Sequence, residues 1–426
     1  MKLRFWSGLS LACLLAAPAL ATETRVLSLS GAADYVWDNS HVYKFPSVTP
    51  LYYRSVMAEL GEEGGLVHSR SSVGLLHADE EQSFGVVGLA VNRRSAGYQA
   101  LLDYLTPVRN DTFSVDIVTR LQDRNLARRL MIIWEPAASY QGLYARKIGA
   151  YTGGIMIGRS AWSALDGYGD EERKANSGAL DLTLGLGYEP QDNLRADVAL
   201  AYSHLSFGSS YAVAGQDSAQ NLSSDGAFRL ALDGRMFYAL NEDMVIVPRL
   251  KIVRTDMGYS YWQEGDSLLA KGSTKSTGLE LGCGWNYQYR SHLKLVAGLD
   301  LGYSKTVIED SLVAGFPGDV KHSSTVWAFP GWHLGMEANL REWVTARMGA
   351  TQRAVSTTEL TDYTDGASRR KEDASQPYDF NAGLTFKMSN LALDLLLNPE
   401  IIYSGGNLAS GSKTWPVASA ALGYRF

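Results

Sequence analysis

Histidine, serine and acidic side chains are the residues of this chain that could carry out acid–base, nucleophilic or metal chemistry. Seven histidines are present, yet no two of them stand at the spacing of a metal-binding pair. The motifs His-Glu-x-x-His and Gly-x-Ser-x-Gly do not occur, and neither does a phosphate-binding Gly-x-x-x-x-Gly-Lys loop. Two cysteines are too few for a Cys-based zinc site. We therefore expect no enzymatic activity, no metal and no other cofactor.

A run of basic residues is the second candidate for chemistry. It comprises Arg229, Arg235, Arg249 and Lys251, on two segments that are neighbours along the chain. Such a group can hold a carboxylate, because charge-assisted hydrogen bonds act locally whatever the net charge of the chain. The alternative role is structural pairing with acidic residues on adjacent strands, which fixes the strand register.

The composition limits the class of protein that positions these residues. Hydrophobic residues make up 46% of the 426 residues, so the chain is not a disordered one. The formal net charge is −6, which argues against nucleic acid as a partner because phosphate binding needs a basic face.

Residues 1–21 have the pattern of a cleaved secretory signal peptide. Lys2 and Arg4 precede an apolar stretch that stops at Pro18, and Ala19-Leu20-Ala21 is a small-x-small cleavage site. No later stretch approaches the roughly 20 apolar residues that a membrane helix needs. The exported chain is therefore expected to be either a soluble protein or a membrane β-barrel, whose hydropathy signal is weak.

Strict alternation of apolar and polar residues runs through most of the chain from residue 148 onward. In 180–188, four leucines and Tyr188 share one face, and Asp181, Thr183 and two glycines share the other. A helix would scatter those leucines around its axis, whereas a strand places them on one side. The apolar faces often end in Tyr or Trp, as a lipid-facing band with aromatic girdles requires.

The connections favour a barrel over a soluble sandwich. Short turns at 190–193, 241–243, 290–291, 341–342 and 389–390 alternate with long polar loops near 161–177, 206–225, 260–275, 306–323, 357–375 and 405–413. Outer-membrane barrels have short periplasmic turns and long external loops. The chain ends in an amphipathic strand whose Tyr424 and Phe426 resemble the assembly signal of bacterial outer-membrane proteins, which implies the barrel-assembly machinery as a partner.

The expected fold class is therefore all-β: a transmembrane antiparallel β-barrel of about 14 strands, with twelve to sixteen allowed. Two early strands, at 69–76 and 83–92, precede about twelve more. Residues 101–105 are interpreted as possible helix, and 113–119 and 130–134 as possible further strands. The predicted lumen face carries nearly balanced charges, so we expect no strong ion selectivity, which needs a ring of one sign.

The N-terminal segment 22–61 does not alternate. Its Gly31-Ala32-Ala33 patch is followed by Asp38-Asn39-Ser40, by Val42-Tyr43 and by Phe45-Pro46-Ser47. This order resembles the entry segment of the FadL/TodX-like long-chain fatty-acid transporter family, although Phe45 stands where that family has Asn. The resemblance implies a hatch folded inside the barrel, with a ligand path past Asp38, Asn39, Tyr43, Phe45 and Pro46. Simple packing of the aromatic residues against the wall is the alternative.

The domains expected are thus a signal peptide at 1–21, a plug at 22–61 and a barrel at 62–426 in the bacterial outer membrane. The favoured function is passive transport of a hydrophobic or amphipathic, fatty-acid-like small molecule, because no N-terminal box for an inner-membrane energiser is evident. The alternatives are a general or polymer-export porin, and a membrane platform for a secretion or surface machine. Outer-membrane lipid and lipopolysaccharide, the hydrophobic ligand and the assembly machinery are the expected partners.

Overall fold

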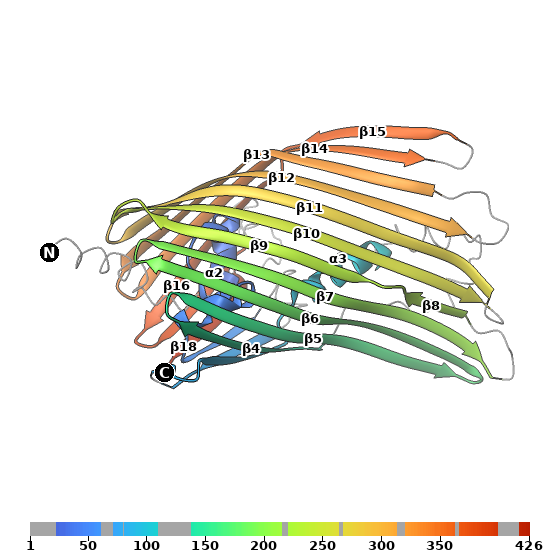
Figure 1. Cartoon of the computed structure of the whole chain (residues 1–426), viewed down its shortest axis with the longest axis horizontal. Coiled ribbons are helices and arrows are strands. Elements are labelled where there is room, and N and C mark those ends of the chain that lie inside the picture. Colours follow the sequence, from blue (N-terminus) through green and yellow to red (C-terminus); the bar gives the residue numbers. More distant parts are fainter. Residues whose placement is uncertain are drawn as a thin grey trace, which may run out of the picture.

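The computed structural model describes residues 23–60, 71–79, 81–109, 138–214, 220–263, 267–312, 320–362, 366–398 and 417–426. Over these residues one antiparallel sheet closes on itself, because β1 pairs with β2 on one side and with β18 on the other (Figure 1). The strands follow the chain order around the wall: β1 (Ser55–Leu60), β2 (Ser71–His77), β3 (Val86–Val91), β4 (Ala138–Ile148), β5 (Tyr151–Tyr168), β6 (Glu171–Gln191), β7 (Leu194–Val213), β8 (Gln220–Ser224), β9 (Phe228–Ala239), β10 (Met244–Gln263), β11 (Ser267–Arg290), β12 (Leu293–Leu312), β13 (Val320–Arg341), β14 (Val344–Asp362), β15 (Ser368–Ser375), β16 (Tyr378–Met388), β17 (Leu391–Leu397) and β18 (Val417–Arg425).

The described wall has sixteen strand positions. β8 and β9 both lie between β7 and β10, and β15 and β16 both pair with β14, so each of these pairs is one interrupted strand. Sixteen lies within the predicted range of twelve to sixteen strands but exceeds the favoured number of about fourteen by two. The additional strands are β1, which lies inside the segment predicted as plug, and β4, which precedes the alternating part of the sequence. The two proposed strands at 113–119 and 130–134 lie outside the described residues.

The alternation predicted for the wall is confirmed. On β6, Asp181 and Thr183 are buried, whereas Leu180, Leu182 and their neighbours on the same face are exposed. The exposed face of a barrel in a membrane contacts lipid, so leucine is stable there. Aromatic pairs such as Tyr151–Tyr188 stand at the ends of this apolar band.

The short turns are confirmed, but most of the predicted long loops are not loops. β5 continues to Tyr168 and β6 begins at Glu171, so most of 161–177 is a paired hairpin. β10 and β14 likewise run deep into predicted loops. The extensions of β6 and β14 are mainly polar on both faces, which removes the alternation, but the backbone ladder needs no apolar face. The predicted loop at 405–413 lies outside the described residues.

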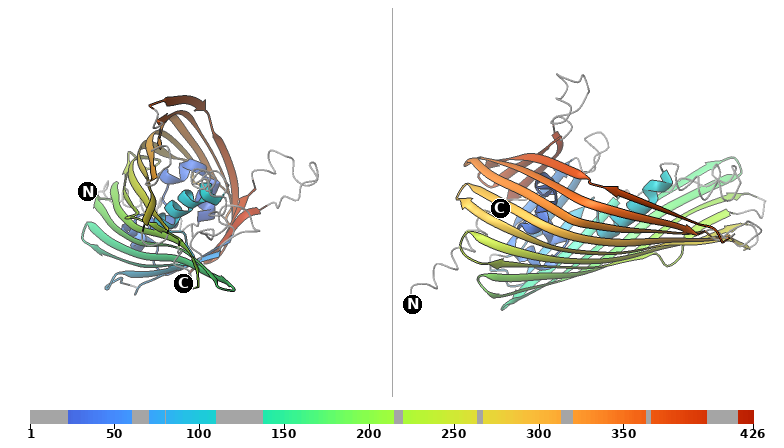
Figure 2. Two further views of the ribbon diagram at one scale, coloured as in Figure 1. Left: turned by 90° about the vertical axis from the view of Figure 1, so that its right-hand side faces the viewer. Right: turned by 90° about the horizontal axis from the view of Figure 1, so that it is seen from above.

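Two segments occupy the interior (Figure 2). The first, here called the plug, consists of α2 (Glu23–Ser28) and the 3-10 helices η1 (Ser30–Tyr35), η2 (Asn39–Tyr43) and η3 (Pro46–Leu51). The second is α3 (Ala96–Arg109), which agrees with the helical interpretation of 101–105. Because Ser55–Leu60 is a wall strand, the plug ends before residue 55 rather than at 61. None of the described helices is long and apolar enough to cross a membrane.

Candidate functional site

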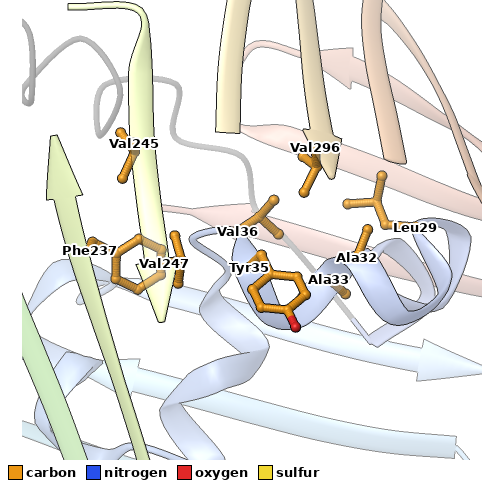
Figure 3. Close-up of a cluster of buried hydrophobic side chains, with 9 residues drawn as sticks. All are labelled: Leu29, Ala32, Ala33, Tyr35, Val36, Phe237, Val245, Val247 and Val296. Atoms are coloured by element: carbon orange, nitrogen blue, oxygen red, sulfur yellow. The ribbon is translucent and has the colours of Figure 1, made fainter. Parts of the chain in front are cut away.

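The plug has a small apolar core that it shares with the wall (Figure 3). Leu29, Tyr35 and Val36 of the plug pack against side chains of β9, β10 and β12, among them Phe237 and Val296. Trp37 stacks on Phe237 with a ring-centroid distance of 3.9 Å. Burying these side chains stabilises the plug where a barrel of this width would otherwise hold water.

Glycines on the lumen face make room for the plug. The ring of Tyr35 lies over Gly284 and Gly298, where any Cβ atom would overlap it. A Cβ atom at Gly154 on β5 would overlap the backbone of Pro46, and one at Gly185 on β6 would lie 2.8 Å from the amide nitrogen of Ser47. Each of these glycines is therefore a point where the plug approaches the wall closely.

Ion pairs fix the plug to the wall along most of its length. Arg25 contacts Glu337 at 2.9 Å and Asp38 at 3.5 Å. Lys44 contacts Asp233 of β9 at 3.1 Å. The bridges to Glu337 and Asp233 join the plug to the wall, whereas the Arg25–Asp38 bridge links two parts of the plug. The remaining polar contacts between plug and wall include Asp34–Arg249, Tyr35–Asp300, Ser47–Asp197, His41–Arg235 and Ser30–Asn381.

The five residues assigned to a ligand path by the family resemblance all have packing partners. Asp38 caps η2 by accepting a hydrogen bond from the Ser40 amide at 2.8 Å. Asn39 donates to the sulfur of Met57, and Tyr43 lies under the guanidinium of Arg93 at 3.9 Å. Phe45 and Pro46 are buried against the wall, with Phe45 beneath Arg235. None of the five lines the cavity described below.

His41 is expected to make the plug sensitive to acid. Its Nδ1 lies 2.7 Å from Nη1 of Arg235, so it must be neutral to accept that hydrogen bond. Burial, together with the charge of Arg235, holds the pKa of His41 well below its usual range. The displaced plug would therefore bind more protons than the docked plug, and docking should weaken by up to about 1.4 kcal/mol per pH unit below about 6.5.

The measurement is plug protection from protease in vesicles between pH 7.5 and 5, with His41→Gln as the comparison. Glutamine can still accept a hydrogen bond from Arg235 but does not titrate. Asp38, whose pKa is raised by burial, is present in both proteins, so its contribution to the acid response cancels in the comparison. An equal acid response in both proteins would contradict the assignment to His41.

A cavity of about 660 Å³ separates α3 from the wall formed by β9 to β12. Its lining is mixed: alanine, aliphatic and tyrosine side chains supply apolar surface, and charged, amide or hydroxyl side chains make up most of the rest. α3 is held against the opposite wall by Tyr104, which packs on Phe207, and by buried Leu101. The residues that line the cavity are Ala96, Gln99, Ala100, Tyr104, Arg229, Lys251, Val253, Thr255, Met257, Thr274, Ser276, Gly278, Glu280, Thr306 and Ile308.

The predicted basic cluster is divided between the plug and this cavity. Its four members lie on β9 and β10, which pair directly, with Arg249 opposite Arg235. Arg235 and Arg249 face the plug, where Arg249 also contacts Asp300 at 3.3 Å. Arg229 and Lys251 line the cavity instead. Two of the four basic residues are therefore used in contacts with the plug, and the other two, Arg229 and Lys251, remain accessible to a ligand in the cavity.

His333 of β13 is buried on the lumen face, and its carboxylate partner comes from the neighbouring strand β12. His333 contacts Asp300, and its Nδ1 lies 2.8 Å from the hydroxyl of Thr351. Glu337 instead pairs with Arg25 and with Arg347, the latter at 2.7 Å. Among the described residues, no group of three metal-ligating side chains gathers anywhere.

The terminal residues lie at the closure of the barrel. Tyr424 and Phe426 stack with a centroid distance of 6.4 Å, and both side chains are half exposed. The amide of Phe426 donates to the carbonyl of Arg54, just before β1. An exposed aromatic pair at the end of the last strand is the arrangement that an assembly signal would need.

Solved structures of outer-membrane transporters resemble this chain over most of its length. TodX, a monoaromatic hydrocarbon channel solved as a deltaS2 mutant, matches with a TM-score of 0.37 and 9% identity over 91% of this chain and 94% of that one. TbuX, the toluene transporter of Ralstonia pickettii, matches with a TM-score of 0.35 and 12% identity over 91% of this chain and 93% of that one.

The ferric-catecholate import receptor Fiu of E. coli K12 matches with a TM-score of 0.36 and 7% identity over 87% of this chain and 81% of that one. No protein-family model and no curated protein sequence matches the chain. These are similarities of architecture, so the substrate of this barrel has to be argued from its own residues.

Proposed function

We propose that this barrel carries a hydrophobic or amphipathic small molecule passively across the bacterial outer membrane. The observation that supports this most is the cavity between α3 and β9–β12. Its volume of about 660 Å³ lies within the roughly 300–1,000 Å³ of small-molecule sites. The plug lies between α3 and the end of the barrel where the C-terminus is found (Figure 2). A ligand would enter between the outer strand extensions, rest in the cavity, and leave past the plug or through a gap in the wall.

The lining of the cavity favours a ligand with an apolar body and an anionic head. Val253, Met257 and Ile308 supply apolar surface, while Arg229 and Lys251 supply positive charge on one side. Lys251 lies 3.5 Å from Glu280, and this exchangeable ion pair is where a ligand carboxylate would bind. A fatty-acid-like molecule satisfies both parts of the lining, whereas a hydrated ion or polymer would gain nothing from the apolar part.

Binding of an anionic chain and of its neutral ester tests this proposal. The purified barrel is titrated with a fluorescent long-chain fatty acid and with the methyl ester of the same acid. Arg229→Gln and Lys251→Gln should each weaken binding of the acid about tenfold or more, because a charge-assisted hydrogen bond contributes roughly 1.5–3 kcal/mol. The ester should bind the variants and the parent equally.

Arg254→Gln is the matched control, because Arg254 lies on the same strand as Lys251 but on the exposed face. Equal losses for Arg254→Gln and Lys251→Gln would contradict a role for the cavity. Failure of the parent barrel to bind either molecule, with large steady conductance in a planar bilayer, would favour a general or export porin.

A further inference from the structure

The exposed face of β10, β11 and β12 carries a cluster of cations at the edge of the apolar band. It consists of Arg254, Lys275 and Lys305, here called the outer basic cluster. All three side chains are exposed, and they alternate with residues that line the lumen cavity, such as Val253 and Thr306. Their side chains therefore point away from the lumen, toward the surroundings of the barrel.

The strand register places the three side chains of the cluster close together on neighbouring strands. Arg254 lies opposite Thr277, and Thr277 lies opposite Lys305. Lys275 lies two residues beyond Thr277 on the same face of β11. With strands about 4.8 Å apart, the backbones of Arg254 and Lys305 are about 10 Å from each other. Side chains of this length can reach a single phosphate group placed over Thr277.

Two residues along each strand from the row of Arg254, Thr277 and Lys305, the next side chains on the exposed face are apolar on all three strands. Ile252 lies opposite Leu279, and Leu279 lies opposite Tyr303. Tyr303 packs on Trp327 of the next strand with a centroid distance of 4.7 Å, as aromatic residues do at a membrane interface. Further down the same face, Leu281 and Leu299 are exposed to lipid. The change from apolar to basic residues thus falls at the level where acyl chains end and headgroups begin.

The charges of the cluster are only partly neutralised by the protein. Lys275 lies opposite Asp256 and 4.0 Å from Glu309, which pairs more closely with Lys321 at 2.7 Å. Within the part of the chain that the structure describes, Arg254 and Lys305 form no ion pair. Several other exposed cations on the outer extensions have acidic partners, such as Asp225 for Lys271 and Glu372 for Arg370.

We infer that the outer basic cluster binds the phosphate of a phosphorylated glycolipid, the lipid A part of lipopolysaccharide, while the apolar band below contacts its acyl chains. The inference rests on the outer-membrane location but not on transport, since the site faces away from the cavity. A phosphate needs several charge-assisted donors, and the cluster offers a guanidinium, two ammonium groups and the Thr277 hydroxyl. An uncharged lipid would leave these cations without a partner.

Lipid A binding by the purified barrel in nanodiscs tests the inference, with retained lipid counted by native mass spectrometry. Each cation near an anionic headgroup contributes roughly fivefold to affinity. The triple variant Arg254→Gln, Lys275→Gln, Lys305→Gln should therefore lose on the order of 100-fold. The control variant Lys271→Gln, Arg370→Gln, Lys371→Gln removes three exposed cations that have acidic partners and should bind like the parent.

Dephosphorylated lipid A and inorganic phosphate identify the group that is recognised. The parent barrel should bind dephosphorylated lipid A as weakly as the triple variant binds lipid A. Equal binding of lipid A by the triple and control variants would overturn the inference. Displacement of lipid A by millimolar inorganic phosphate would assign the cluster to free anions and would overturn it as well. Both variants should keep the parent's fatty-acid affinity, so a failure of the transport proposal would appear in a different measurement.

Discussion

Replacing Gly154 and Gly185 with valine is expected to convert a closed barrel into one that conducts ions. The two glycines lie on adjacent strands, and the backbone of Pro46 and Ser47 occupies the space that a side chain would need. Backbone atoms cannot rotate aside, so each valine should cost at least the roughly 1–3 kcal/mol of an overpacked core. With η3 expelled, the lumen of a barrel of this size would fill with water.

Single-channel recording in a planar bilayer measures this effect directly. The parent should show no steady current, and the double variant should approach a version that lacks residues 22–47. Gly153→Val is the matched control, because Gly153 adjoins Gly154 but has open space where a Cβ would be placed. A silent double variant with an intact barrel would show that the glycine contacts do not hold the plug in place.

Arg25→Met should release the beginning of the plug while leaving the barrel folded. Arg25 is 7% exposed and is the cation shared by Asp38 and Glu337. Methionine fills similar volume but leaves two carboxylates buried without that cation. Breaking a buried pair in this way costs roughly 3–5 kcal/mol, which is large compared with any single exposed contact of the plug.

Protease cleavage within residues 22–47 in sealed vesicles, together with conductance, measures the release. Lys44→Met is the control, because Lys44 is about one-third exposed and its pairing with Asp233 should contribute only about 0–1 kcal/mol. Adding Asp38→Asn and Glu337→Gln to Arg25→Met should restore much of the protection by removing the buried charges. If Arg25→Met were cleaved no faster than Lys44→Met, the bridge would not be what holds the plug.

The wall could be predicted where lipid faces one side and water or charge faces the other. On β6 and β12 the apolar and polar residues separate cleanly, because the two sides of each strand meet different media. On β4 the rule fails, since Leu143 and Ala145 point inward and are buried. The plug gives the lumen face of that strand an apolar partner, so alternation disappears although the strand remains.

The candidate site was predictable only in part. The lumen-facing charges followed from alternation, and so did the location of Arg229 and Lys251 on neighbouring strands. Their separation from Arg235 and Arg249 was not predictable, because it depends on where the plug ends and where α3 folds into the lumen. The glycines opposite Tyr35 could have indicated a plug, because small residues on the inner face of a strand leave room for a bulky side chain or another segment to pack against it.

The unequal lengths of the strands also determine how the ring closes. Over the described residues, β1 meets β18 through six residue pairs and β2 through six, whereas β5 and β6 share a ladder along all 18 residues of β5. The barrel therefore consists of a wide region of long, extensively paired strands and a short seam, where β1 pairs with β18 and β2. Because few backbone hydrogen bonds join its two edges, we expect that seam to form late in folding and to open with the smallest loss of free energy. The chain's final residue, bonded to Arg54, lies at the end of the seam.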